Sequence, residues 1–448
     1  MRKRTGNSWL FLAKTALIAA VLAVFFVGQL LFYTETRFYF WGNYIILLLY
    51  AANLFFTCSI YRGMHFGSID RHESVLSWIL SLLIANALQY LLLSLLEARL
   101  LPAVGFVIVM AVQVAVVIPM IFITDKLYYF LHPAQKAMII YGSANRARMY
   151  AGIIQKHRKR FEICSSLSQE EPLETLFSHI RESESVFFID VDEKYRNRLF
   201  EYCFRNEKRL YIAPSFSGVL LNTAEISWIS NTPMFLPKSP EIEPVMQFVK
   251  RAMDILFSLL AITLLSWLML IIWGAVRLSD RGPAIYKQVR VTKGGKQFTL
   301  YKFRSMRLDA EADGIARLSS QGDSRVTSIG RFIRKTRIDE LPQFFNILFG
   351  AMSLVGPRPE RPEISEQYEK EYPNFSLRTK VKAGLTGYAQ IYGKYNTAPE
   401  EKLFLDLMYI ETFSIWQDVK LILQTFKVVF MPSSTEGVSE DITTALRY

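Results

Sequence analysis

Two adjacent acids, Asp339 and Glu340, lie in a strongly basic stretch of the chain and are the residues best suited to chemistry. The basic side chains just before them are Arg331, Arg334, Lys335 and Arg337. Such a cluster is predicted to lower the pKa of both carboxyl groups and to attract phosphate. Asp339 fits a nucleophile, and it also fits the N-cap of a helix that contains Pro342. Both roles are compatible, because a helix N-terminus also binds phosphate.

Other basic residues are candidates for holding phosphate. Arg358 stands between two prolines, which fix the backbone around its guanidinium, although a rigid surface loop would show the same pattern. Lys302 and Arg304 lie two residues apart in the sequence, so both are predicted to project from one face of a strand. A solvated strand edge is the alternative.

The missing residue types limit the chemistry. All five histidines precede residue 180, and the last of the three cysteines is Cys203. Histidine bases, cysteine nucleophiles and His/Cys metal sites are therefore excluded from the C-terminal part, which must use carboxylates, Lys, Arg, Tyr or Ser. Sparse cysteine also fits a reducing compartment.

Four apolar runs, each near the roughly 20 residues needed to cross a bilayer, occupy the first third of the chain. They are residues 9–33, 41–60, 75–95 and 104–123. We predict a four-helix transmembrane domain over residues 1–130. A cleaved signal peptide is the alternative for the first run, which is too long for one. Lys and Arg in the short loops predict that both ends of this domain face the cytoplasm.

Residues 136–240 are predicted to form a cytoplasmic Rossmann-like α/β module followed by a linker. Short apolar runs at residues 138–141, 161–164, 186–189 and 210–213 alternate with helix-like stretches, which is typical of a parallel sheet. Only Gly142 remains of the three glycines that a dinucleotide site needs, so the module is predicted to be non-catalytic. The prolines of residues 222–240 predict the linker.

A fifth apolar run, residues 255–276, is long enough to span the membrane. Crossing there would place the basic segment that follows outside the cell. A segment that enters and leaves on the same face avoids this conflict. The net charge of +12 suits anionic lipids and phosphorylated substrates, but a membrane protein with basic cytoplasmic loops has such an excess anyway.

The C-terminal motifs resemble those of a known family. They are Arg281-Gly-Pro283, Tyr301-Lys-Phe-Arg-Ser-Met306, Arg325-Val-Thr, Ile338-Asp-Glu-Leu-Pro-Gln343, Val355-Gly-Pro-Arg-Pro359 and Gly384-Leu-Thr-Gly-Tyr-Ala-Gln390. Residues 248–430 resemble the bacterial sugar transferases, the monotopic polyprenyl-phosphate phosphoglycosyl transferases. The preceding part resembles, more weakly, the N-terminal extension of large members such as the undecaprenyl-phosphate glucose or galactose phosphotransferases.

The resemblance implies that Asp339 attacks the β-phosphate of a UDP-sugar, releases UMP and carries the phospho-sugar until undecaprenyl phosphate displaces it. It implies that Glu340 binds Mg²⁺. The residues expected to contact substrate, mostly at its phosphates, are Arg358, Lys302, Arg304, Arg337, Glu360 and Gln390. Residues 248–448 would then form a re-entrant membrane helix and a small α/β catalytic domain.

Two positions depart from the family pattern. The apolar segment normally turns at a Ser-Pro pair, but this chain has Ser266 and Trp267. The Ser266 hydroxyl can bond a backbone carbonyl and bend a helix, so the turn is still predicted there. Ala383 replaces a frequent proline and is expected to loosen its loop. Residues 403–430 are predicted to form an interfacial amphipathic helix pair, with ordinary core helices as the alternative.

These expectations describe a multi-pass protein of the bacterial inner membrane with its catalytic domain on the cytoplasmic face. It would start capsule, exopolysaccharide or glycan assembly, and we expect a homodimer and no nucleic-acid partner. A membrane-anchored nucleotide-sugar dehydratase or epimerase is a rival, but the chain lacks Tyr-x-x-x-Lys. A non-enzymatic scaffold or regulator of polysaccharide export is another rival. No motif identifies the sugar.

Overall fold

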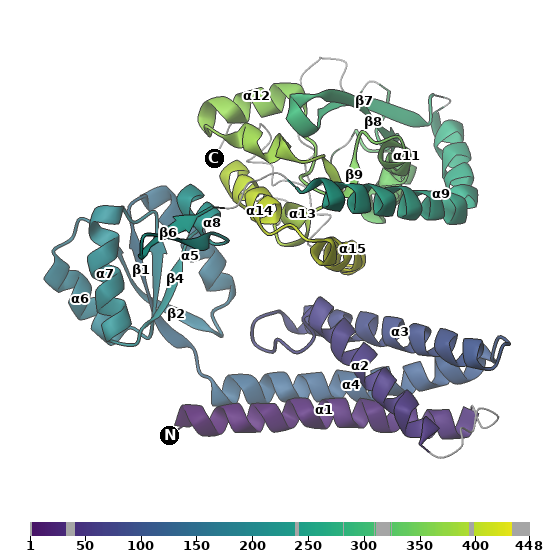
Figure 1. Cartoon of the computed structure of the whole chain (residues 1–448), viewed down its shortest axis with the longest axis horizontal. Helices are drawn as coiled ribbons and strands as arrows, with labels where there is room; N and C mark the ends of the chain where they lie inside the picture. Colours follow the sequence, from purple (N-terminus) through teal and green to yellow (C-terminus); the bar gives the residue numbers. More distant parts are fainter. Residues whose placement is uncertain are drawn as a thin grey trace. The chain divides into compact units, whose positions relative to one another are not determined.

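The computed structural model describes residues 2–32, 41–237, 242–280, 282–308, 310, 323, 325–393 and 398–431. Arg37, Pro240 and Arg281 lie outside the described residues, as do residues 432–448 of the predicted catalytic region. The chain forms two compact units, Met1–Ala213 and Pro214–Tyr448 (Figure 1).

The predicted spans are long apolar helices. They are α1 (Arg2–Phe32), α2 (Gly42–Tyr61), α3 (Arg71–Leu96) and α4 (Ala103–Leu131). Tyr50 and Trp78 lie fully buried between them, whereas apolar side chains such as Leu48 and Leu95 are exposed. With α9 of the second unit, five helices in the described part of the chain are long and apolar enough to cross a membrane. Such an exposed apolar surface suits hydrocarbon.

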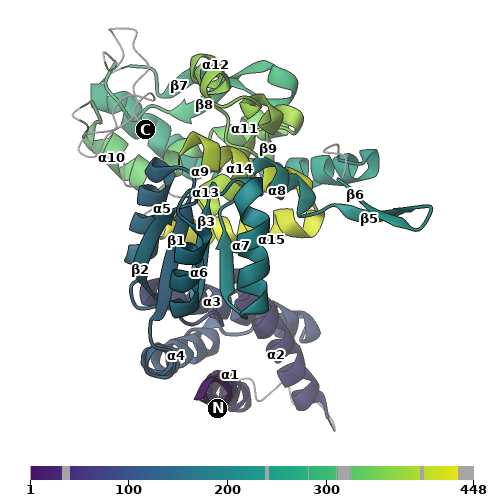
Figure 2. The same cartoon turned by 90° about the vertical axis from the view of Figure 1, so that its left-hand side faces the viewer.

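The predicted α/β module is confirmed as a parallel sheet. Its strands are β1 (Gln135–Tyr141), β2 (Phe161–Ser168), β3 (Ser185–Ile189) and β4 (Arg209–Ile212), in the order β2-β1-β3-β4. Helix α5 (Ala144–Lys156) packs on one face, and α6 (Leu173–Glu182) and α7 (Glu193–Arg205) pack on the other (Figure 2). A Cβ atom on Gly142 would lie 2.2 Å from the Asp190 carbonyl oxygen, so close backbone approach accounts for this glycine.

The predicted linker contains a β-hairpin, which the prolines of residues 222–240 did not predict. Strand β5 (Glu225–Ile229) pairs with β6 (Thr232–Leu236), and Figure 2 shows the pair as a projecting arm. Ser230 and Asn231 form the turn with φ values of 46° and 67°, the left-handed conformation of a two-residue hairpin loop. Pro233 lies in a two-stranded ribbon, where a proline is tolerated at an edge. Helix α8 (Phe216–Leu221) precedes the hairpin.

Charged residues in the first part of helix α9 (Pro244–Asp280) attach it to the rest of the second unit. Arg251 donates to the carbonyl oxygens of Ile347 and Leu348, both at 2.7 Å. The Asp254 carboxylate accepts hydrogen bonds from Ser353 Oγ at 3.0 Å and from the Leu354 amide at 2.8 Å. Its end packs on the same domain, because Ile272 and Val276 share a buried cluster with Phe303 and Ile333.

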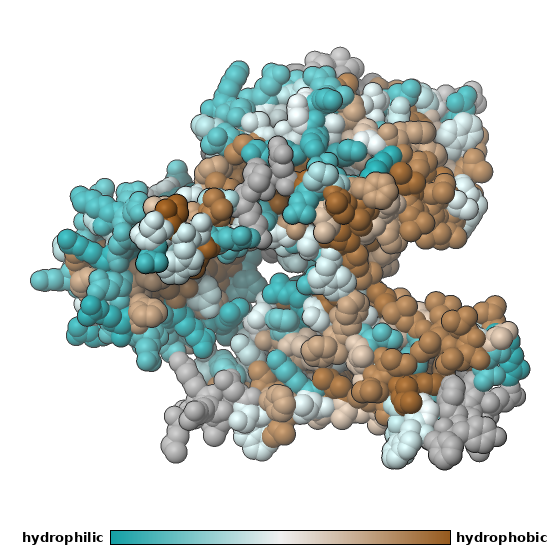
Figure 3. Space-filling view, in the orientation of Figure 1, coloured by the Kyte–Doolittle hydropathy of each residue, from teal (hydrophilic) through white to brown (hydrophobic). Residues whose placement is uncertain are grey.

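Figure 1 shows that α9 bends sharply, so its two halves run in different directions. Between the anchored ends the helix exposes large apolar side chains, including Leu264, Trp267 and Leu270. Figure 3 shows hydrophobic side chains gathered over this helix. Ser266 Oγ donates to the Thr263 carbonyl oxygen at 3.0 Å, a contact of the kind that bends helices. The location of the turn at Ser266 and Trp267 stays a prediction.

The second unit is built from short elements, and its larger buried cluster includes Met352, Phe375 and Tyr409. Strands β7 (Ile285–Val291) and β8 (Gln297–Phe303) form an antiparallel hairpin, and β9 (Ser353–Val355) pairs in parallel with β10 (Gly384–Thr386). The helices are α10 (Ser328–Lys335), α11 (Gln343–Leu348), α12 (Pro362–Glu371), α13 (Tyr388–Ile391), α14 (Pro399–Glu411) and α15 (Ile415–Val429). Single 3₁₀ segments are η1 (Lys293–Gly295), η2 (Ile338–Glu340) and η3 (Phe375–Lys380).

The last two helices differ from each other. Helix α14 is largely buried, with Leu403, Leu407 and Asp406 inside, as the alternative of a core helix predicted. Helix α15 buries Asp418 and exposes Phe426, so its polar side faces the protein and part of its apolar side faces outward. That inverted pattern suits a membrane interface.

Candidate active site

Asp339 lies at the centre of the 3₁₀ turn η2, between α10 and α11. Arg337 enters this turn with a φ of 57°, and Ile338 and Leu341 anchor its two sides in the apolar cluster around Ile333. Asp339 does not cap α11, whose N-cap is Pro342. The N-cap alternative is therefore wrong, because the turn ends before that helix begins.

The Asp339 carboxyl group is 9% exposed, and its Oδ1 atom has no hydrogen-bond partner in the described part of the chain. Burial and the neighbouring Glu340 charge raise its pKa to about 6, against the opposing effect of Lys302, Arg334 and Arg337. The prediction that the cluster lowers this pKa is wrong, because burial outweighs the nearby cations. Asp339 Oδ1 therefore has no hydrogen bond among the described residues that would have to break before it could react.

Glu340 is held by cations from three separate segments. Its Oε1 atom lies 2.9 Å from Arg358 Nη2, 3.5 Å from Arg337 Nη1 and 3.6 Å from Lys302 Nζ. Burial by itself would raise the pKa of this carboxyl group, but the three cations hold it well below its usual range. Glu340 is therefore ionised at neutral pH, as the sequence predicted.

Lys302 projects from β8 toward η2, whereas Arg304, two residues later, turns elsewhere. The Arg304 amide donates to the Ala284 carbonyl oxygen at 2.8 Å, and a Cβ atom on Gly282 would lie 2.2 Å from Arg304 Nη1. The structure thus brings Lys302 to Glu340 and places the Arg304 guanidinium beside Gly282. Burial lowers the pKa of Lys302, and Glu340 opposes this effect.

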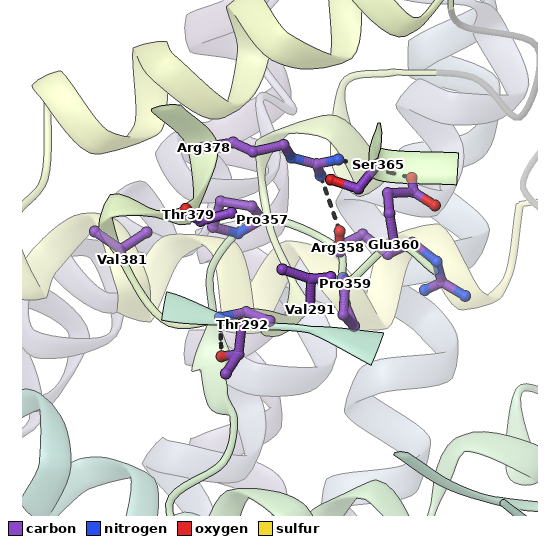
Figure 4. A pocket seen from close by; sticks show the side chains of 11 residues that line it. Val291, Thr292, Pro357, Arg358, Pro359, Glu360, Ser365, Arg378, Thr379 and Val381 are labelled. Atoms are coloured by element: carbon purple, nitrogen blue, oxygen red, sulfur yellow. Dashed lines mark hydrogen bonds and ion pairs between the residues drawn. The ribbon is translucent and has the colours of Figure 1, made fainter. Parts of the chain in front are cut away.

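The segment that carries Arg358, residues 357–360, is fixed by two further arginines. Arg290 Nη1 donates to the Pro359 carbonyl oxygen at 3.0 Å, and Arg378 Nη2 donates to the Arg358 carbonyl oxygen at 2.8 Å. Glu360 lies 3.8 Å from Arg290. It also lies 3.7 Å from Arg378 (Figure 4). Glu360 therefore pairs with two arginines that also bind this segment.

Behind this segment lies a charge pair that sequence reasoning missed. Arg378, which is 5% exposed, pairs with Asp406 of α14 at 2.7 Å. Burial raises the pKa of Asp406 to about 6, although Arg378 opposes the shift. A small hollow of about 20 Å³ lies beside Arg378, lined by residues of β7, the 357–360 segment and η3 (Figure 4).

Gln390 belongs to α13, the short helix that follows β10. Neither amide atom of its side chain has a hydrogen-bond partner among the described residues. A Cβ atom on Gly387 would lie 2.8 Å from Gln390 Oε1 and 2.3 Å from the Gly356 carbonyl oxygen. Gln390 thus lies near the start of the segment that presents Arg358.

The residues at η2 fit a metal ion that comes with its phosphates. No group of three or more His, Cys, Asp or Glu side chains that could hold a metal occurs in the described part of the chain. Glu340 nevertheless supplies an ionised carboxylate beside cations that could hold substrate phosphates. Mg²⁺ is commonly held by one or two carboxylates together with substrate phosphates.

The fold and the site together define a class. A buried carboxylate and three converging cations, in a domain built on an exposed apolar helix, suit an anionic substrate at a membrane surface. The bacterial sugar transferase family profile matches residues 245–432. A putative undecaprenyl-phosphate N-acetylgalactosaminyl 1-phosphate transferase of Bacillus subtilis is 52% identical over 130 residues, which are 29% of this chain and 72% of that protein. The chain belongs to the bacterial sugar transferase family.

Longer relatives match over the same region. One relative is a UDP-N-acetylgalactosamine-undecaprenyl-phosphate N-acetylgalactosaminephosphotransferase of Aeromonas hydrophila. It is 43% identical over 189 residues, which are 42% of this chain and 44% of that protein. A UDP-glucose:undecaprenyl-phosphate glucose-1-phosphate transferase of Klebsiella pneumoniae is 41% identical over 223 residues, 48% of this chain and 47% of that protein. The chain thus spans about half the length of these relatives.

Proposed function

We propose that this protein transfers a sugar-1-phosphate from a UDP-sugar to undecaprenyl phosphate and releases UMP. The observation that carries the proposal is Asp339, a buried carboxylate with an unbonded oxygen beside the cations that bind Glu340. The names of the relatives support the substrates, since they include undecaprenyl phosphate and UDP-glucose. This step would start the assembly of a capsule, exopolysaccharide or other glycan.

In the first step, Asp339 Oδ1 attacks the β-phosphorus of the UDP-sugar. A bond forms between this oxygen and phosphorus, the bond to the bridging oxygen breaks, and UMP leaves with that oxygen. In the second step, a phosphate oxygen of the lipid attacks the same phosphorus and displaces the aspartate. The products are an undecaprenyl diphosphate sugar and the free carboxylate.

The cations of the site have a distinct task in both steps. Arg358 and Lys302 hold phosphate oxygens while negative charge spreads over them, and Arg337 adds to the positive field. Glu360 and Gln390 are proposed to contact substrate or to orient the residues that contact it. Glu340 would hold a Mg²⁺ ion, which would supply positive charge to the diphosphate.

Helix α9 is proposed to enter and leave the inner membrane on its cytoplasmic side. Both ends of α9 pack on the catalytic domain, through Asp254 at the start and Val276 at the end, and the helix bends between them. The catalytic domain would then rest on the inner leaflet, where a nucleotide-sugar from the cytoplasm meets the lipid phosphate. The helices α1 to α4 would anchor the chain.

The test is UMP release by the purified full-length protein in nanodiscs with undecaprenyl phosphate, Mg²⁺ and a panel of UDP-sugars. We expect release with one sugar, loss of release on chelation, and loss in the Asp339→Asn variant. Folded protein that releases no UMP with any sugar would overturn the proposal and favour a non-enzymatic scaffold.

A further inference from the structure

The carboxylate of Glu340 occupies the position at which the site's cations converge. Arg358, Arg337 and Lys302 all approach the same oxygen, Oε1, within 3.6 Å or less. These cations come from the 357–360 segment, the turn η2 and strand β8. Carboxylates and phosphates accept the same charge-assisted hydrogen bonds from guanidinium and ammonium groups. Glu340 therefore makes the contacts that a bound phosphate would need.

The burial of Glu340 makes this arrangement hard to undo. Its side chain is 12% exposed, so the ion pairs are poorly screened by water. A phosphate that drew the cations away would leave a buried carboxylate without compensating charge, which is unfavourable. Another cation would therefore have to bind Glu340 when the phosphates draw Arg358 and Lys302 away.

We infer that Glu340 is a place-holder for the donor's diphosphate, and that binding proceeds by exchange of ion pairs. The diphosphate takes Arg358 and Lys302, and the carboxylate that they release accepts the divalent cation that accompanies the diphosphate. The metal requirement then arises in binding, before any bond is made or broken. This inference rests on the proposed function.

The neighbouring acid, Asp339, is excluded from the exchange by its surroundings. Among the described residues the ion pairs of the two acids all go to Glu340, and Asp339 Oδ1 has no hydrogen-bond partner there. The two adjacent carboxylates are thus divided between tasks. Glu340 balances the cations before substrate arrives, while Asp339 keeps an oxygen for the reaction.

The test measures the affinity for inorganic pyrophosphate by calorimetry, with Mg²⁺ and with a chelator, on the full chain in nanodiscs. In the wild type we expect the affinity for pyrophosphate to fall by at least about tenfold when metal is removed, because Glu340 competes for the cations. In Glu340→Gln the metal-free affinity should rise on the order of tenfold above the wild-type value, and Mg²⁺ should no longer strengthen binding. Glu366→Gln, the same change at an exposed position of α12, should behave as the wild type.

Glu340→Asp provides a second variant that keeps the buried charge and withdraws the carboxylate from Arg358. Its metal-free affinity should lie between those of the wild type and Glu340→Gln. If neither variant binds pyrophosphate more tightly than the wild type without metal, the place-holder role is wrong, even when the wild type releases UMP. If neither the wild type nor any variant binds pyrophosphate, with or without Mg²⁺, both the phosphate site and the proposed function are wrong.

Discussion

Arg378 Nη2 donates a hydrogen bond to the main-chain oxygen of Arg358 at 2.8 Å, so a buried guanidinium holds the backbone of the residue that reaches Glu340. The same nitrogen of Arg378 pairs with Asp406 at 2.7 Å. Helix α14 thereby fixes the position of Arg358 through Arg378. Arg378 acts as a positioning residue, since its contacts are with the protein around the site.

Replacement of Arg378 by lysine should slow the reaction. An ammonium group cannot reproduce the planar fork that spans Arg358, Glu360 and Asp406. We expect Arg378→Lys to lower kcat by about tenfold, equivalent to ~1.4 kcal/mol of transition-state stabilisation, and to lower Tm because Asp406 is fully buried. Steady-state UMP release and thermal unfolding measure the two effects. Lys380→Gln, an exposed neighbour on η3, is the control. A kcat that is unchanged in Arg378→Lys would remove the positioning role.

The raised pKa of Asp339 should make stability depend on pH. Its pKa is about 6 in the folded protein and near 3.8 when the group is free, so the folded state favours the protonated form. The contribution of Asp339 to stability is therefore full below about pH 4 and is lost as the pH rises through 6.

Asp339→Asn removes that pH-dependent loss. We expect the variant to exceed the wild type in stability at pH 8 by at most about 3 kcal/mol, and this advantage should vanish near pH 4. Thermal unfolding in chelator at both pH values measures the difference, with Glu366→Gln as the control. An equal difference at pH 8 and pH 4 would contradict the raised pKa.

The sequence was sufficient for features that depend on local composition. The four apolar runs became α1 to α4, and the short apolar runs after them became the parallel strands β1 to β4. Both patterns reflect burial or membrane contact along one segment, so periodicity and length reveal them. Asp339 and Glu340 were predicted in the same way, as acids in a basic stretch.

Features that depend on contacts between distant segments were missed. Arg378 meets Asp406 and Arg358 only in the folded domain, and each looks like an ordinary charged residue in the sequence. The pKa of Asp339 was predicted in the wrong direction because burial is a tertiary property. The turn formed by Ser230 and Asn231 has a local signal, but the prolines within residues 233–240 favour a linker.

Gly384 should not tolerate a side chain, because it lies against the start of the Arg358 segment. A Cβ atom there would be 2.1 Å from the Gly356 amide nitrogen. We expect Gly384→Ala to separate β9 from β10 and to destabilise the domain by about 1–3 kcal/mol. Thermal unfolding tests this, and UMP release should fall with it. Gly274→Ala is the matched control, because its Cβ atom meets nothing within 4 Å. Equal Tm values for the two variants would show that β9 and β10 can move apart freely.

The re-entrant course of α9 predicts that both of its flanks face the same side of the membrane. Gln247 precedes the apolar part of the helix, Lys287 follows it, and both side chains are exposed. In a background with Cys58, Cys164 and Cys203 replaced by serine, we expect Gln247→Cys and Lys287→Cys to resist an impermeant maleimide in intact cells. Both should react after the membrane is opened, because both would lie in the cytoplasm. Reaction of Lys287→Cys alone in intact cells would mean that α9 crosses the membrane, and it would separate the catalytic domain from cytoplasmic UDP-sugars.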